Sequence, residues 1–482
     1  MLCRTEVHRT PRRTRGGLAV FVASALCGCS SLLGLDEGAE REPSSRSGES
    51  GSSGGASDGS SGNTTSGSSG ASGSFSTGSG GSSGSSGPTS SSGGMVSLEG
   101  PDCGDLRAYA ASPWPMAGAC PTRPAAAAVP PLRAPRVRWH YDYPASAYFA
   151  GGVSLAADGS VLGVVRLLEA EQSTYYLVGI AADGSRETLR VALPALSAEV
   201  SAPTLAADGT AYLRDARSLI AVRAGAVAWS TPLEEGSRQV PLLLPNGTIV
   251  TGAKHDVVFV DPVTGAATTK LALGTLASDP VVRDLVLSPT GVIYVLTEQG
   301  PGGGAGGKLY ALTATGETYF EPQAFDDRPL NPPLFDAAGD VFFANRQSAY
   351  SYSPQGTRIW QVSAGNVSFT SLDIVRNRNL VLAPCGSGGC ARLFDTASQS
   401  TSSLTGLDAD VFAAVGAGDG SFVFSLTESR TFEEHVVGYA PDGTLRWTLT
   451  VPNVDGGPRS AALGADGAYY SGRGNSLYAI GD

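Results

Sequence analysis

Short apolar runs separated by tight turns fill the chain from residue 151 to its end. The apolar runs inside segments such as "SLIAVRAG" and "KLYALTATG" are short and contain β-branched and aromatic residues, which is typical of β-strands. Asp-Gly, Asn-Gly or similar pairs join many of these runs, and such dipeptides close β-hairpins. No segment shows the period of an amphipathic helix, so we expect an all-β fold.

The hairpin turns recur about every 44 residues. A second apolar run follows each turn, and often a third that ends on Trp, so one unit reads strand, turn, strand, strand, turn, strand. Four short strands per unit of this length are typical of a propeller blade. We expect an eight-bladed β-propeller of four-stranded antiparallel blades, with a degenerate sixth turn near Asn377. The other seven units have their turn glycines at Gly159, Gly209, Gly247, Gly291, Gly339, Gly420 and Gly467.

The eighth unit stops after its third strand, "SLYAIGD" at 476–482. A matching fourth strand stands far upstream in "PRVRWHYDYP" at 135–144, where Val-Arg-Trp corresponds to the Leu-Arg-Trp of 445–447. This N-terminal strand is predicted to complete the last blade, because a closed ring has no unpaired edge between its first and last blades. Four tryptophans then occupy the same position in their blades, and we expect them to pack against neighbouring residues rather than to bind a ligand. They are Trp139, Trp229, Trp360 and Trp447.

The N-terminus carries an export signal. Five Arg in the first 15 residues precede an apolar run over 16–26, which is too short to span a membrane. The end of the run resembles the bacterial lipobox, with Leu26 and Gly28 before Cys29, the predicted lipidation site; a plain signal peptide is the alternative. The next residue is Ser30 rather than Asp, and the resemblance implies an outer-membrane lipoprotein, on the periplasmic side or the cell surface.

A Ser/Gly-rich stretch over 47–94 separates this signal from the repeats. It has one aromatic residue and almost no charge, so it cannot bury enough surface to offset its ordering entropy, and we expect a disordered tether. The predicted parts are a signal peptide at 1–28, a lipidated tether at 29–98, a disulfide-containing lead-in at 99–134 and a propeller at 135–482.

Four cysteines remain once the signal is removed and Cys29 is lipidated: Cys103, Cys120, Cys385 and Cys390. An even number in an exported protein suggests two disulfides, and proximity favours pairing 103 with 120 and 385 with 390. The second pair, "CGSGGC", has four intervening residues, so we interpret it as a hairpin staple rather than a redox C-x-x-C.

The charge pattern argues against two classes of ligand. The net charge is −11, no Lys/Arg cluster occurs after residue 15, and we expect no nucleic-acid partner. The four His residues have no metal-ligand spacing, so a His-based metal site is not expected.

The tail "GADGAYYSGRGNSLYAIGD", the units "APDGTLRW" and "PQGTRIW", and the lead-in "SPWPMAGACPTR" resemble repeats of the pyrroloquinoline-quinone-like (PQQ-like) propellers. This family contains quinone-dependent dehydrogenases and cofactor-free propellers. The enzymes hold their quinone against a disulfide between adjacent cysteines and bind calcium through Glu, Asn and Asp, and this sequence has no Cys-Cys pair. Asp261, Thr264 and Gly265 match the enzymes' tryptophan-docking repeat, but Thr269 replaces its Trp. We therefore expect no cofactor and no catalysis.

These features predict a monomeric, membrane-anchored scaffold whose propeller binds envelope proteins or polymers. The resemblance extends in architecture to propeller lipoproteins of outer-membrane protein assembly complexes. Extended loops in blades four, six and seven, such as "GPGGGAGG" and the acidic "TFEEH", are predicted to decorate one face as a partner site. A divergent quinone dehydrogenase and a carbohydrate-binding surface propeller are the alternatives.

Overall fold

The computed structural model describes residues 102–482 apart from short gaps. The chain divides into two units, 1–89 and 90–482, and the first lies wholly outside the described residues, as does Cys29. The gaps are 124, 170–171, 195, 197–199, 237–238, 275–278, 300–305, 330–331, 337, 364–367, 377–378, 386–391, 396–397, 399, 405–408, 429–433 and 453–460.

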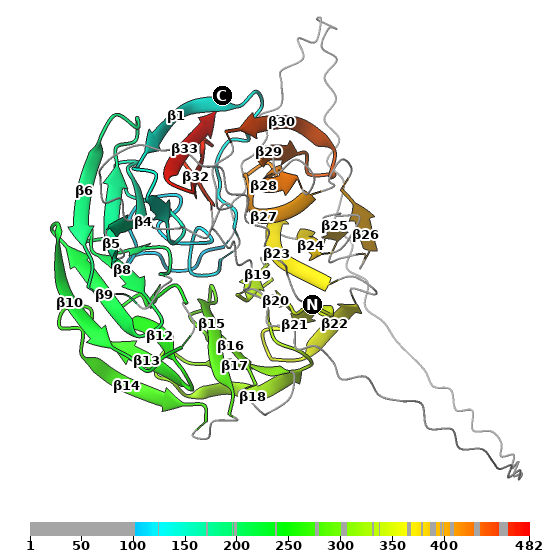
Figure 1. Ribbon diagram of the computed structural model, residues 1–482. Coiled ribbons are helices and arrows are strands. Elements are labelled where there is room, and N and C mark those ends of the chain that lie inside the picture. The colour runs from blue at the N-terminus through cyan, green and yellow to red at the C-terminus, as the bar shows by residue number, and fades with distance from the viewer. Residues whose placement is uncertain are drawn as a thin grey trace, which may run out of the picture. The chain divides into compact units, whose positions relative to one another are not determined.

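The second unit is an all-β propeller whose antiparallel sheets surround a common axis (Figure 1). In six of the sheets each strand pairs with its chain neighbour, and one terminal strand lies near the axis while the other lies at the rim. A five-stranded sheet contains β2 (Ala147–Phe149), β3 (Ser154–Leu155), β4 (Val161–Glu169), β5 (Gln172–Ile180) and β6 (Glu187–Ala192).

Seven sheets have four strands. The first three contain β7 (Thr204–Leu205), β8 (Ala211–Arg214), β9 (Ser218–Arg223) and β10 (Ala226–Pro232); β11 (Leu242–Leu243), β12 (Ile249–Ala253), β13 (Asp256–Val260) and β14 (Ala267–Ala272); and β15 (Val281–Leu287), β16 (Ile293–Glu298), β17 (Gly307–Leu312) and β18 (Thr318–Phe325). The next three contain β19 (Leu334–Phe335), β20 (Val341–Ala344), β21 (Ser348–Tyr352) and β22 (Arg358–Ser363); β23 (Ser368–Arg376), β24 (Asn379–Cys385), β25 (Arg392–Asp395) and β26 (Ser400–Ser403); and β27 (Ala409–Gly416), β28 (Phe422–Glu428), β29 (Glu434–Tyr439) and β30 (Leu445–Val451). The last contains β31 (Ala461–Leu463), β32 (Tyr469–Arg473), β33 (Ser476–Gly481) and β1 (Arg136–Asp142).

The prediction of four-stranded antiparallel blades is confirmed. The predicted number of eight such blades is wrong, because the structure has seven and the remaining sheet has five strands. In that sheet the innermost strand is interrupted, and its two pieces, β2 and β3, both pair with β4. Gly151 lies at the interruption, where a Cβ would stand only 2.7 Å from the carbonyl oxygen of Val200 in the neighbouring part of the ring. A side chain at Gly151 would therefore collide with the neighbouring part of the ring.

The predicted ring closure is confirmed. β1 pairs with β33 in antiparallel register, with Val137 opposite Ile480 and Trp139 opposite Ala479, and a bulge lies between the two pairs. The same bulge occurs in β10 between Val227 and Trp229, so the two strands are equivalent. The carboxylate of the last residue, Asp482, also accepts hydrogen bonds from the backbone of Arg133 and Ala134, both at 2.9 Å.

The turn glycines sit where the backbone requires them. All seven predicted glycines (Gly159, Gly209, Gly247, Gly291, Gly339, Gly420 and Gly467) have φ between 77° and 86°, a region that side chains with a Cβ rarely adopt. The Asp before the glycine usually supports the turn: Asp158 Oδ1 accepts hydrogen bonds from the backbone and hydroxyl of Ser160, at 2.9 and 2.6 Å. The repeated motif therefore encodes a turn rather than a ligand site.

The rim tryptophans lock neighbouring sheets together. Trp139 donates its indole N–H to the carbonyl of Ala182 and Trp229 donates to that of Pro262, at 3.0 and 3.1 Å, and both acceptors lie in the turn before the last strand of the next sheet. A glycine in each of these turns admits the ring. Trp447 donates to Leu132 instead, since the closing sheet has no covalent turn between β33 and β1. Trp360 packs on Phe394 of the next blade, with ring centroids 4.7 Å apart.

Gly265→Ala should destabilise the protein more than Gly209→Ala. Both glycines have positive φ, 73° and 81°, so each alanine costs about 1–2 kcal/mol of backbone strain. At Gly265 a Cβ would also lie 2.6 Å from the Trp229 ring, whereas at Gly209 nothing lies within 4 Å. Urea unfolding of both variants measures the difference, and equal losses would contradict tryptophan docking as an inter-blade lock.

Acid should weaken the propeller through its turn aspartates. Hydrogen bonds from Ser160 lower the pKa of Asp158, and those from Thr444 lower the pKa of Asp442. Because the folded-state pKa lies below the unfolded value of about 4, this stabilisation is present above pH 4 and is lost as the pH falls through the folded pKa. Unfolding free energies measured from pH 6 to 2 should fall, and Asp158→Asn should show a shallower fall than the parent.

Candidate functional site

The two ends of the ring differ in their connections. Connections from first to second strand and from third to fourth lie at one end, here called the turn end, and those from second to third lie at the other, the loop end. At the loop end, the β8–β9, β12–β13, β20–β21 and β32–β33 connections have two or three residues, but the connections over 299–306, 386–391 and 429–433 have five to eight. The topology thus puts all three predicted long loops in one class of connection; their residues at 300–305, 386–391 and 429–433 lie outside the described residues.

At the turn end the lead-in runs along the axis side of the innermost strands. The last residue of an innermost strand donates its backbone N–H to the lead-in at equivalent positions in five sheets. The donors and acceptors are Leu155 to the carbonyl of Trp114 (2.8 Å), Leu205 to Pro115 (2.9 Å), Leu287 to Pro121 (3.0 Å), Gly416 to Ala125 (2.7 Å), and Leu243 to the hydroxyl of Tyr109 (2.7 Å). The lead-in therefore satisfies backbone groups that would otherwise face the axis unpaired.

The lead-in also crosses the middle of the ring. Arg123 contacts the β15–β18 blade through an ion pair with Asp284 at 2.5 Å, and two residues later Ala125 bonds to the β27–β30 blade. In the sequence, the β19–β22 and β23–β26 blades lie between the two blades that the lead-in contacts here. Arg123 and Ala125 both have φ of 48°, and Ala119 has 73°. Such strain in side-chain-bearing residues persists only where surrounding contacts enforce it.

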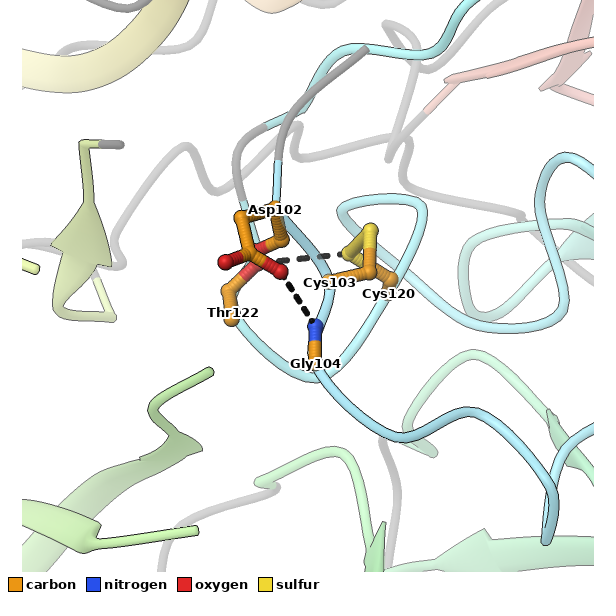
Figure 2. The surroundings of a disulfide bond; sticks show 5 residues. All are labelled: Asp102, Cys103, Gly104, Cys120 and Thr122. Carbon is orange, nitrogen blue, oxygen red and sulfur yellow. Dashed lines mark hydrogen bonds between the residues drawn. A yellow bond between two sulfur atoms is a disulfide. The ribbon is translucent and has the colours of Figure 1, made fainter. Parts of the chain in front are cut away.

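A disulfide closes the first loop of the lead-in, as Figure 2 shows. Cys103 is bonded to Cys120, the pairing that proximity predicted, with their Cα atoms 5.7 Å apart. Asp102 accepts from Gly104 N–H at 3.0 Å and from the Thr122 hydroxyl at 3.2 Å, which brings the two ends of the loop together. The loop encloses the "WPM" of the sequence motif, and Trp114 and Met116 are buried. Cys385 ends β24 and Cys390 lies outside the described residues, so the second disulfide stays a prediction.

Buried charges gather at the loop end. Arg214, at the end of β8, is fully buried and donates to the carbonyl of Gly252 in the next blade at 3.3 Å. Arg473, at the equivalent end of β32, is paired with Glu434 of the preceding blade, and burial raises the pKa of that carboxyl while Arg473 opposes the rise. Each guanidinium therefore links two sheets, and sequence reasoning did not single out either one.

A surface groove lies at the loop end, between the five-stranded sheet and the β7–β10 blade. Its volume is ≈ 330 Å³, near the lower bound for ligand pockets. Arg217 on its wall is two-thirds exposed and pairs with Glu235 at 2.8 Å. The groove is lined by Pro194, Leu196, Asp215, Arg217, Ser218, Ser230 and Pro232.

Next to the groove, the five-stranded sheet carries two arginines that lie over tyrosine rings. Arg166 lies 5.1 Å from the ring centroid of Tyr148 and 5.8 Å from that of Tyr175. Arg190 lies 5.8 Å from Tyr143 and 5.5 Å from Tyr176. No motif marked these residues, since cation and rings come from different strands; the only sequence signal was the aromatic pair in "STYYLVGI".

The donor sets do not fit a quinone–calcium centre. The one disulfide among the described residues joins cysteines 17 positions apart and belongs to the lead-in, so it is not the adjacent pair of the enzymes. Within residues 102–482, gaps excepted, no group of three or more His, Cys, Asp or Glu side chains is placed to hold a metal ion. Gly265 of the tryptophan-docking remnant receives Trp229 of the preceding blade, while Thr269 lies in β14.

No protein-family model matches the sequence, and no curated protein matches it. Among solved structures, the chain is similar to the quinohemoprotein alcohol dehydrogenase from Comamonas testosteroni (TM-score 0.54, 12% identity, covering 79% of this chain and 82% of that one). It is also similar to the C-terminal WD40 domain of Sif2 (TM-score 0.52, 12% identity, 73% and 99%) and to BamB from Moraxella catarrhalis (TM-score 0.46, 15% identity, 72% and 98%). The first two of these, with TM-scores above 0.5, confirm the propeller fold, and at these identities they show the fold alone. In the described part of the chain, no helix has the length and apolar character needed to cross a membrane.

Replacing Arg123 should destabilise the ring. Its side chain is 4% exposed, and Arg123→Met leaves Asp284 half-enclosed without its cation, which costs about 3 kcal/mol. Arg107→Met is the matched control in the same segment, because the Arg107–Asp105 pair is exposed and contributes little. Thermal unfolding of the two variants and of the Arg123→Met/Asp284→Leu double variant tests this; a double variant no more stable than Arg123→Met would contradict a charge effect.

Proposed function

We propose that this chain is a non-catalytic lipoprotein, anchored in the outer membrane through Cys29, whose propeller holds partner proteins in the cell envelope. One observation carries the proposal: the variable connections of the ring are concentrated at its loop end. Among the connections from second to third strand, the three longest follow β16, β24 and β28, whereas those that follow β8, β12, β20 and β32 have only two or three residues. Loops of unequal length on a rigid scaffold are the usual location of binding residues in proteins.

The contacts at the turn end also favour the loop end as the binding surface. There the chain's own lead-in bonds to the innermost strands of five sheets, so this end of the axis is occupied by structural contacts. The rim tryptophans at this end are used in contacts between sheets. Binding surface is therefore to be sought at the loop end, within reach of a membrane to which a long Ser/Gly tether connects the ring.

A photo-activatable cross-linker in place of Gln347, at the loop end, should capture envelope proteins in living cells. The same group in place of Val263, which is 66% exposed at the turn end, should capture few or none. Mass spectrometry of the cross-linked species measures both, with Cys29→Ala as the control for anchoring. Equal capture at the two positions, or none above the unanchored control, would remove the support for a loop-end scaffold.

Shortening the long loops should abolish partner capture without unfolding the ring. Replacing 299–306 or 429–433 by an Asn-Gly turn gives a two-residue hairpin, which the β12–β13 connection already accommodates in this protein. Melting temperatures should stay within a few degrees of the parent. Retention of the same cross-linked partners after both replacements would show that the loops are not the binding surface.

A further inference from the structure

The two arginine–tyrosine clusters of the five-stranded sheet differ in charge. In each, a guanidinium lies over two tyrosine rings, an arrangement that attracts the cation to the ring faces. Arg190 has an acid of its own: its Nε and Nη2 donate to the two carboxylate oxygens of Glu187, at 2.7 and 2.9 Å. This cluster is complete without any ligand.

Arg166 has the same aromatic surroundings but no acid. Its Nε donates to the Ser173 hydroxyl at 2.8 Å, and its Nη1 donates to the Tyr148 hydroxyl. Among its contacts with the described residues none is a carboxylate. A guanidinium has five N–H donors, so Arg166 is held in one orientation by neutral groups while its charge and some donors remain for a further group.

The carboxylates described around the groove already have cations or donors. Asp215 Oδ1 accepts bonds from the backbone of Arg217 and Ser218, at 3.0 and 2.5 Å, and Oδ1 lies 3.9 Å from Arg214. Glu235 is paired with Arg217. Among the described residues, Arg166 is therefore a guanidinium of this junction with no carboxylate in contact, on a chain whose net charge is −11.

The Arg166 cluster adjoins the groove. Leu193 donates its N–H to the carbonyl of Tyr175 at 2.9 Å, and the next residue, Pro194, is part of the groove wall. Burial raises the pKa of Tyr175, and the charge of Asp215, on the opposite wall, adds to that rise. Tyr175 thus contacts Arg166 through its ring and, through its backbone carbonyl, the residue that precedes the groove wall.

We propose that Arg166 and this groove bind a carboxylate carried by an extended acidic peptide of a partner protein. Arginine–carboxylate contacts are strong and geometrically specific, and a guanidinium whose described contacts are all neutral is complementary to an acid. A peptide fits because the groove reaches Ser230 and Pro232 of β10, a rim strand that pairs with β9 alone in its sheet. Its outer edge can add hydrogen bonds to an extended chain. The inference rests on the proposed scaffold function and names a partner class for it.

Fluorescence anisotropy of labelled octaglutamate against the purified full-length protein tests the inference. We expect binding that weakens with salt, and no binding of labelled octaglutamine. Arg166→Gln should weaken octaglutamate binding about tenfold or more, because a charge-assisted contact is lost. Arg190→Gln is the matched control and should change binding less than about twofold, since its guanidinium is neutralised by Glu187.

Two further measurements keep the result interpretable. Melting curves establish that Arg166→Gln is folded, and Arg166→Lys, which keeps the charge but loses the planar fork, should bind between the parent and the glutamine variant. Equal binding of the two peptides by the parent, or equal losses in the two glutamine variants, would overturn the proposal. Arg166-dependent binding of oligogalacturonate without octaglutamate binding would also overturn it, in favour of an acidic glycan. Loop-end capture at position 347 that survives Arg166→Gln would leave the scaffold function standing on its own.

Discussion

The antiparallel pairing of β1 with β33 joins residues more than 330 positions apart, and the rest of the structure depends on it. Without it the closing sheet would lack its rim strand, Trp139 would lose its position over the turn of the five-stranded sheet, and two sheet edges would be open. The contacts of Asp482 with Arg133 and Ala134 reinforce the pairing at the last residue of the chain. A ring closed by hydrogen bonds rather than by a covalent turn requires support around the junction, and Leu132 supplies it by accepting the Trp447 indole N–H.

The lead-in gives the ring a second, independent closure. Each innermost strand has one edge turned to the axis, where its backbone groups require partners. The lead-in supplies carbonyls, and one tyrosine hydroxyl, to five sheets and crosses between blades that are not neighbours, with a disulfide fixing its first loop. A short segment of irregular structure thereby ties the sheets into one body. The cost is visible in the positive φ of Ala119, Arg123 and Ala125, none of which is a glycine.

The two ends of this ring differ in how regularly their side chains and connections repeat. At the turn end, side chains repeat from sheet to sheet because they make the same contacts: the glycine accepts the turn, the aspartate caps it, and the tryptophan docks on the next sheet. At the loop end the repeat breaks down, and buried guanidiniums, long connections and the groove differ from one junction to the next. Arg166 and Arg190 show how far two sites can diverge, since both lie over paired tyrosines and only one has a carboxylate.

The sequence by itself determined the all-β class, the blade unit, the closing strand and the first disulfide, because each has a local signature: a two-residue hairpin turn, a spacing, a Val-Arg-Trp triplet, two cysteines close in the chain. It did not predict the split strand, since the close approach of Gly151 to Val200 involves two sheets. It could not find the Arg166 cluster either, because Tyr148, Arg166 and Tyr175 come from three different strands and meet only when β2, β4 and β5 pair. The interruption of the strand, the lead-in contacts along the axis and the contact of Arg166 with two tyrosines were decided by tertiary structure, which alone brings residues from different strands and sheets within contact distance.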